Sequence, residues 1–243
     1  MRRPFIYPHR SARALPLTLG RAGGAISAAA ALTIVVWRLR GLVVAAHNAV
    51  VVQLCRAAGL EDARTHFAPA FGLLLEVVTV PSSQVHAAMP WLAAGCAIAL
   101  LATVAVAFPL LRGLAAFIVV VITLSLVSLL ARAPAMQTVE GFATLWMQTE
   151  LLVWLALPSV TTFLFVIVQP SLIRGFAWMV GVEAFAILWS AVRLVVLLGF
   201  GFYTGTALLL ALWFVGGLLA DALYLVTFYS WSIHANLNFS RGR

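Results

Sequence analysis

The residues of this chain that are best suited to chemistry are ionisable side chains inside apolar stretches. The stretch EAFAILWSAVRLVVLLGFG places Arg193 among side chains typical of a membrane interior. Burying an arginine at the centre of a bilayer costs at least ~2.5 kcal/mol, so we expect it to have a partner or a function there. Four acids lie in comparable surroundings: Glu76, Glu150, Glu183 and Asp221.

The depth of each side chain, counted at about 1.5 Å per helical residue, predicts which of them meet Arg193. Glu150 and Glu76 each lie a few residues from the outer end of a predicted helix, and His86 lies in the neighbouring segment VPSSQVHAAMPW. We expect these three to form a charged site with Arg193 in the outer half of the membrane. The site is either an ion pair that fixes helix register or a binding site for a ligand, a substrate or a partner helix.

The helix that follows Arg193 offers an aromatic ring and a second acid. Trp213 is predicted to lie level with Arg193, where its indole offers a cation–π contact. Asp221 and Glu183 are predicted to lie level with each other in the inner half, too deep to meet Arg193. These two acids are either hydrogen-bonded within the helix bundle or part of a proton pathway.

The composition predicts that the solvent of this chain is a lipid bilayer. Of its 243 residues, 64% are hydrophobic and 9% are charged, and the mean hydropathy is +1.08. Such values exclude a soluble globular domain and a disordered chain. The net charge of +8 comes from arginines at the ends of apolar runs, where they set topology. Because they form no basic face, nucleic acid is not expected as a partner.

The apolar runs predict an all-α, polytopic transmembrane bundle of about eight spans. A span needs about 20 helical residues, or about 17 at the short end. The number is between six and eight, because residues 22–58 also fit one long helix or an interfacial hairpin. The predicted spans are 22–37, 41–58, 67–82, 89–111, 113–131, 143–169, 174–200 and 206–231.

The distribution of arginines predicts that both termini are cytoplasmic. With the N-terminus inside, eleven arginines fall at cytoplasmic ends and three, Arg38, Arg40 and Arg132, fall at outer ends. The expected organisation is a basic cytoplasmic segment over 1–21, a single transmembrane domain over 22–231 and a cytoplasmic tail over 232–243.

Familiar catalytic and cofactor motifs are absent from the sequence. It contains no Walker loop, dinucleotide fingerprint, HExxH motif or serine nucleophile elbow. No two histidines stand three or four residues apart, and the two cysteines, Cys55 and Cys96, show no metal-ligand spacing. We therefore expect no cofactor and no metal.

Three stretches in the C-terminal part of the chain carry a resemblance: LALPSVTTFLFVIV, LIRGFAWMVGVEAFAILWSAVRLVVLLGFGFYTG and LWFVGGLLADALYLVTFY. Together they resemble the exosortase/archaeosortase family of membrane transpeptidases, and Arg193 in SAVRLVVL matches the family's membrane arginine. Where the family has its cysteine this chain has Pro158 and Ser159, and near the expected histidine it has Trp213. The resemblance implies a bacterial, multi-pass protein of the inner membrane with that fold. It also implies that the family's catalysis is missing unless Cys96 supplies the thiol nucleophile.

Three functions follow from these patterns. The first is a non-catalytic, exosortase-like subunit or scaffold that holds a partner's transmembrane segment through the charged site around Arg193. The second is a proton-coupled or small-solute transporter that uses the four membrane acids. The third is an exosortase-type transpeptidase acting through Cys96 and Arg193. The expected partners are the lipid bilayer and another membrane protein or a transmembrane segment of one.

Overall fold

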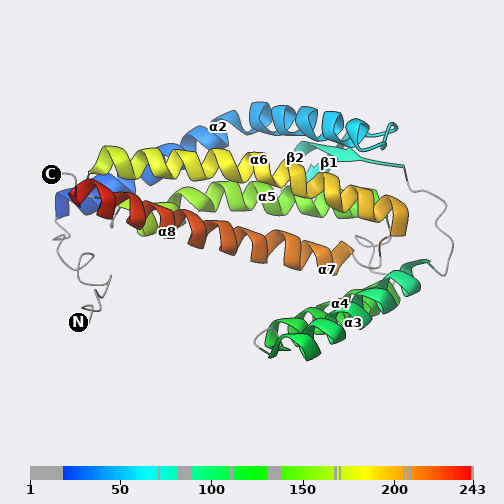
Figure 1. Ribbon diagram of the computed structural model, residues 1–243. Helices are drawn as coiled ribbons and strands as arrows, with labels where there is room; N and C mark the ends of the chain where they lie inside the picture. Colours follow the sequence, from blue (N-terminus) through cyan, green and yellow to red (C-terminus); the bar gives the residue numbers. More distant parts are fainter. Residues whose placement is uncertain are drawn as a thin grey trace, which may run out of the picture. The chain divides into compact units, whose positions relative to one another are not determined.

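The computed structural model of the chain is mostly helical (Figure 1). It describes residues 19–70, 72–81, 89–109, 112–130, 138–166, 169, 171–204, 206 and 209–241. Its helices are α2 (Leu19–Ala57), α3 (Met89–Ala107), α4 (Arg112–Leu130), α5 (Val139–Thr161), α6 (Leu172–Thr204), α7 (Leu209–Trp213) and α8 (Ala220–Arg241). Two π-helical turns, η3 (Thr162–Val166) and η5 (Phe214–Leu219), extend α5 and connect α7 to α8.

Four helical segments of the described chain are long and apolar enough to cross a membrane. These segments are Leu19–Ala57, Val139–Phe165, Leu172–Thr204 and Phe214–His234. Two shorter apolar helices, Ala94–Ala107 and Arg112–Leu124, accompany them. The chain is thus a membrane-embedded helical protein. The eight predicted spans do not all appear as separate helices, and the side of each terminus stays a prediction.

The first two predicted spans form one helix. Residues 22–37 and 41–58 both belong to α2, which passes through Arg38 and Arg40 without a break. Arginine and leucine are good helix formers, so the WRLRG segment interrupts the apolar run but not the backbone hydrogen bonding. At about 1.5 Å per residue, the 39 residues of α2 extend for about 58 Å. This length exceeds the hydrocarbon thickness of a bilayer, which is about 30 Å.

The predicted third span, 67–82, is wrong, and with it the expectation of an all-α fold. This region is an antiparallel β-hairpin of β1 (Arg64–Ala70) and β2 (Leu73–Thr79). Gly59 and Gly72 have φ of +82° and +73°, which glycine adopts without the clash a Cβ causes, so the chain turns before β1 and between the strands. The apolar run LLLEVVTV is short and rich in β-branched residues, which is typical of a strand as well as of a buried helix.

The chain divides into two compact units, and each long helix contributes to both. Unit 1 comprises Met1–Arg38, Val153–Ala186 and Tyr224–Arg243. Its described part contains a run of aromatic contacts, in which Trp178 stacks on Phe165 with ring centroids 6.2 Å apart and meets Trp231 edge-on at 5.4 Å.

Unit 2 comprises Leu39–Leu152 and Ile187–Leu223, and it holds the hairpin together with parts of α2, α5 and α6. Large side chains of α5 and α6 are fully buried in it, among them Trp146, Met147, Leu194 and Leu198. A second apolar cluster joins α3, α4 and α7 through Ala94, Val121, Ile122 and Leu212.

Candidate functional site

Arg193 lies at the centre of a buried ionic cluster in unit 2. Its Nη2 is 3.0 Å from Oε1 of Glu150, and its Nη1 is 2.8 Å from Oδ1 of Asp221. The exposed fractions of the three side chains are 5%, 4% and 13%. We call Arg193, Glu150 and Asp221 the triad; it joins α6 to α5 and α8.

Backbone carbonyls complete the hydrogen bonding of the guanidinium. Nη1 of Arg193 donates to the carbonyl oxygens of Gly216 and Gly217, each at 3.0 Å. Both glycines belong to the π-helical turn η5, and such turns often occur at functional positions. The same nitrogen lies 2.8 Å from Oδ1 of Asp221, so two carbonyls and one carboxylate surround Nη1. The Nε of Arg193 has no hydrogen-bond partner in the described chain.

An aromatic ring covers one face of the guanidinium. The Cζ of Arg193 lies 5.3 Å from the ring centroid of Trp146, within the range of a cation–π interaction. Trp146 is fully buried and stands one helical turn before Glu150 on α5. Four separate elements thus meet at Arg193, and two negative side chains oppose one positive side chain in a low-dielectric interior.

The structure brings Glu150 to Arg193, as the predicted depths indicate, and it also brings Asp221 there, contrary to the prediction. The prediction takes every residue after Tyr203 as helical rise, which places Asp221 well below Arg193. In the structure α6 ends at Thr204 and α7 begins at Leu209. Arg193 is therefore eleven residues from the end of its helix and Asp221 twelve from the start of the returning one, so the two side chains are level.

The indole that covers Arg193 also differs from the predicted one. Trp146, not Trp213, covers Arg193. Trp213 instead packs edge-on against Phe214, with ring centroids 6.0 Å apart. The cause is again the register of the returning helix, which brings Asp221 and the η5 carbonyls to the guanidinium in place of Trp213.

Among the other predicted site residues, those that the structure describes do not join the triad. Glu76 lies on β2 and makes no ion pair with Arg193 in the described chain. His86 lies outside the described residues. Glu183 is buried in unit 1, where neither carboxyl oxygen has a hydrogen-bond partner among described residues. Cys96 is a free, exposed thiol on α3.

The sequence did not predict a buried network of polar side chains that joins α6, α2 and β2. Ser190, one turn before Arg193 on α6, hydrogen-bonds Nε2 of His47 at 3.0 Å, and Nδ1 of that ring is 3.2 Å from Oδ1 of Asn48. Asn48 Nδ2 in turn donates to the carbonyl of Glu76 at 2.7 Å. The signal was the adjacent pair of polar residues, HN, inside the apolar second half of α2. This polar network connects the hairpin to α2 and α6.

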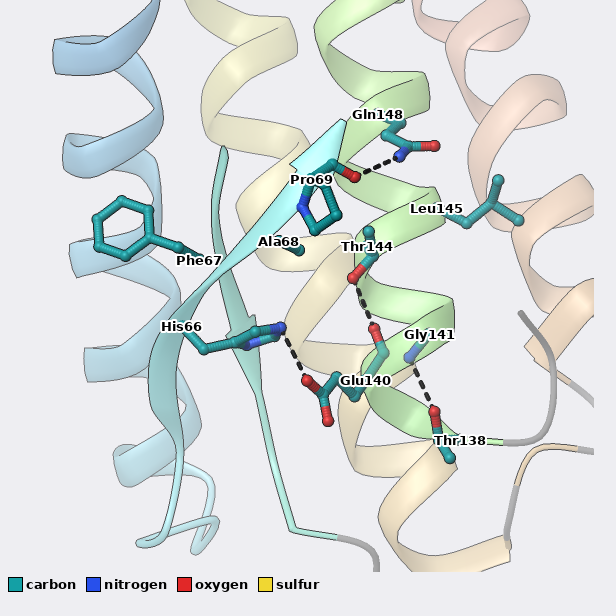
Figure 2. Close-up of a pocket in the computed structure, with 10 residues that line it drawn as sticks. All are labelled: His66, Phe67, Ala68, Pro69, Thr138, Glu140, Gly141, Thr144, Leu145 and Gln148. Carbon is teal, nitrogen blue, oxygen red and sulfur yellow. Dashed lines mark hydrogen bonds and ion pairs between the residues drawn. The ribbon is translucent and has the colours of Figure 1, made fainter. Parts of the chain in front are cut away.

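An open groove of about 510 Å³ lies where β1 faces the beginning of α5 (Figure 2). The strand supplies four consecutive residues, from His66 to Pro69, and α5 supplies Glu140, Thr144 and Gln148. A polar contact connects the two walls, with Nε2 of His66 3.0 Å from Oε1 of Glu140. Figure 2 shows a second connection, from Nε2 of Gln148 to the carbonyl of Pro69 at 3.5 Å.

The groove and the triad lie on different faces of α5. At 100° per residue, Glu140, Thr144 and Gln148 share one face of the helix, whereas Trp146 and Glu150 point to the opposite side. Unit 2 therefore has a closed polar centre and a separate open polar surface.

Comparison with known proteins gives no match to a family model, a curated protein or a solved structure.

Proposed function

We propose that the chain is a non-catalytic subunit or scaffold of the inner membrane, and that it binds a segment of another membrane protein in the groove between β1 and α5. One observation carries this proposal: the triad is closed by the chain's own groups, while the groove stays open. Nη1 and Nη2 of Arg193 already contact the carboxylates of Glu150 and Asp221 and donate hydrogen bonds to two backbone carbonyls. A partner segment at Arg193 would have to displace them.

The placement of charge supports an outward-facing groove. Arg21, Arg174 and Arg241 lie at the beginning of α2, the beginning of α6 and the end of α8, and the positive-inside rule assigns such ends to the cytoplasm. The opposite end of α2 is followed by the acids Glu61 and Asp62 and then by the hairpin. Under this proposal both termini are cytoplasmic, and Arg56 and Arg64 lie on the outer side, contrary to the eleven-to-three count.

A matched pair of phenylalanines tests the proposal. Phe67 belongs to the β1 wall of the groove and is 69% exposed, with its ring directed away from α5 (Figure 2), whereas Phe163 lies in unit 1 and is 71% exposed. A photo-crosslinking phenylalanine analogue is placed at each position in the tagged full chain, which is then irradiated in its native membranes. We expect one protein to co-purify in stoichiometric amounts and to crosslink from position 67 but not from position 163.

Two results would contradict this proposal. One is the absence of any stoichiometric co-purifying protein together with lipid adducts alone at both positions. The other is a partner that crosslinks from position 163 and not from position 67, which would place the binding surface in unit 1.

A transporter is the second candidate, because buried carboxyl oxygens remain unpartnered. Oε2 of Glu150 and both oxygens of Glu183 are buried without a hydrogen-bond partner among the described residues. Buried acids of this kind mark ion and proton pathways in many membrane proteins. Proton flux in liposomes that is abolished by Glu183→Gln would favour this function over the scaffold.

Transpeptidase chemistry of the exosortase type has less support. It requires a thiol nucleophile and its base near the reacting bond, and in the described chain the contacts of Arg193 do not include Cys96. A Cys96→Ala protein that loses processing of a partner would restore this candidate.

A further inference from the structure

The backbone register shows that one edge of the hairpin faces the groove. In an antiparallel pair, residues alternate between those that bond the partner strand and those whose N–H and C=O point away from it. The pair that flanks a two-residue turn, here Ala70 and Leu73, is a bonded pair. Thr65, Phe67 and Pro69 therefore direct their backbone polar groups away from β2.

Two side-chain contacts agree with this register. The carbonyl of Pro69 points out of the sheet and accepts the long hydrogen bond from Gln148. Glu76 is the register partner of Phe67, so its carbonyl points outward on the other edge, where Asn48 of α2 donates to it at 2.7 Å. Pro69 also stands where its missing N–H costs no bond of the ladder.

The two edges of the hairpin differ in how they are satisfied. The β2 edge meets a donor from α2, whereas the β1 edge forms a wall of the groove. In the described chain, the backbone N–H and C=O groups of Thr65 and Phe67 have no hydrogen-bond partner beyond the sheet. Unpaired strand edges are templates for another strand, and unsatisfied backbone groups are costly next to a lipid phase.

The acidic side chains near β1 indicate the charge that a bound segment should carry. The protein carries a net charge of +8 and has seven acids. Three of them are withdrawn into the interior, as Glu150, Asp221 and Glu183. The other four lie on the hairpin or beside it, and three of these, Glu61, Asp62 and Glu140, are exposed. Of these four acids, Glu140 lines the groove, and the basic side chains next to it on β1 are Arg64 and His66. The acidic group available to an occupant of this edge is therefore the exposed carboxylate of Glu140.

We propose that β1 accepts a third strand: an extended segment of a partner polypeptide that displaces the long Gln148 contact with the Pro69 carbonyl and carries a basic side chain in place of His66 beside Glu140. Backbone hydrogen bonds to Thr65 and Phe67 provide the binding energy, as in other cases of strand addition. With seven residues at about 3.3 Å each, β1 offers about 23 Å, enough for a segment of roughly seven residues. This inference rests on the proposed function, since it names how the groove holds a partner.

The test uses the full chain in lipid nanodiscs and a defined probe, the acetylated heptapeptide Arg-Thr-Val-Thr-Val-Thr-Gly. The readout is hydrogen exchange at the amides of Thr65 and Phe67. We expect saturating peptide to slow exchange at both amides by about tenfold or more, because an amide that gains a hydrogen bond is protected from exchange. The same peptide with every amide nitrogen methylated is expected to have no effect, and replacing its arginine by glutamate is expected to weaken binding by about fivefold to tenfold.

Two variants of one position provide the protein-side control. Phe67→Pro removes an outward N–H and leaves the β1–β2 bonds in place, because position 67 is not a bonded pair. Phe67→Leu keeps the N–H and an apolar side chain. We expect Phe67→Leu to bind the peptide within a few-fold of the parent protein and Phe67→Pro to lose at least about tenfold in affinity.

Each outcome separates the inference from the proposed function. No protection of the Thr65 and Phe67 amides at millimolar peptide would overturn strand addition, and so would equal binding of the methylated peptide or equal binding by Phe67→Pro. If a partner still crosslinks from position 67 in that case, the groove binds it by side-chain contacts and the proposed function stands. If no partner crosslinks there, both fail.

Discussion

Nη2 of Arg193 on α6 lies 3.0 Å from Oε1 of Glu150 on α5, and both side chains are at most 5% exposed. A buried pair of this kind adds little stability compared with well-packed apolar residues, but breaking it leaves an uncompensated charge. The triad therefore explains how the bundle tolerates Arg193, and it makes the helix contacts of unit 2 dependent on three side chains.

Replacing Arg193 alone should be strongly destabilising. We expect Arg193→Met to cost about 3–5 kcal/mol, because Glu150 and Asp221 then remain buried without a cation. The measurement is thermal unfolding of the detergent-purified protein. The triple variant Arg193→Met, Glu150→Met, Asp221→Leu should recover most of the loss. A triple variant less stable than Arg193→Met would mean that the triad itself contributes net stability.

The two acids of the triad should differ in their effect on stability. Glu150 accepts a hydrogen bond from Nη2 and its side chain is 4% exposed, whereas Asp221 is 13% exposed and shares an Nη1 whose hydrogens serve two carbonyls. We expect Glu150→Gln to cost about 1–3 kcal/mol and Asp221→Asn to cost less. Unfolding midpoints in the reverse order would show that Asp221 is the main counter-ion.

A pair of glycine substitutions tests the hairpin that replaces the expected third span. Gly72 has φ of +73°, so Gly72→Ala should destabilise the turn by about 1 kcal/mol. Gly41 is an exposed position in the interior of α2, where an added Cβ meets nothing within 4 Å. Gly41→Ala should therefore stabilise the protein by about 0.5–1 kcal/mol. A stabilising Gly72→Ala would argue against the turn between β1 and β2.

The hydrogen bond from Asn48 to the carbonyl of Glu76 should hold the hairpin against α2. Asn48→Ala leaves that carbonyl without its donor, which costs roughly 1–3 kcal/mol. We expect hydrogen exchange at the paired amides of His66 and Val77 to accelerate about tenfold. Thr33→Val is a control on the same helix, because Thr33 donates to Leu155 in unit 1. Equal exchange in both variants would show that the hairpin is held by other contacts.

The sequence predicted a membrane-embedded, mostly helical protein and one partner of Arg193, but not the limits of every helix or the whole site. Composition and run length are enough to identify apolar helices, and depth counting works along one uninterrupted helix, which is why Glu150 was found. The same counting failed for Asp221, because residues that connect two helices add length to the chain without adding depth. The predicted spans do end at 200 and begin again at 206, near the observed limits Thr204 and Leu209, but the depth of Asp221 was counted from Tyr203 without leaving out the residues between the two helices.

The hairpin and its groove were unpredictable for a different reason. A short run such as LLLEVVTV suits a buried helix and a buried strand equally, and only tertiary contacts decide between them. Here the decisive contact is Asn48 on the β2 edge, from a residue 28 positions earlier in the chain. Asn48 contacts the β2 edge of the hairpin, and the groove lies at the other edge, along β1.

The most direct test of the account compares the triad with the groove for partner binding. The tagged parent protein, the triple triad variant and Phe67→Pro are purified from native membranes in parallel, and the ratio of co-purified partner to tagged protein is measured by quantitative mass spectrometry. Each variant is first shown to be monodisperse. The account predicts that the triple variant retains the partner at close to the parent ratio and that Phe67→Pro loses most of it. A triple variant that loses its partner while Phe67→Pro keeps it would place partner binding at Arg193 and contradict the account.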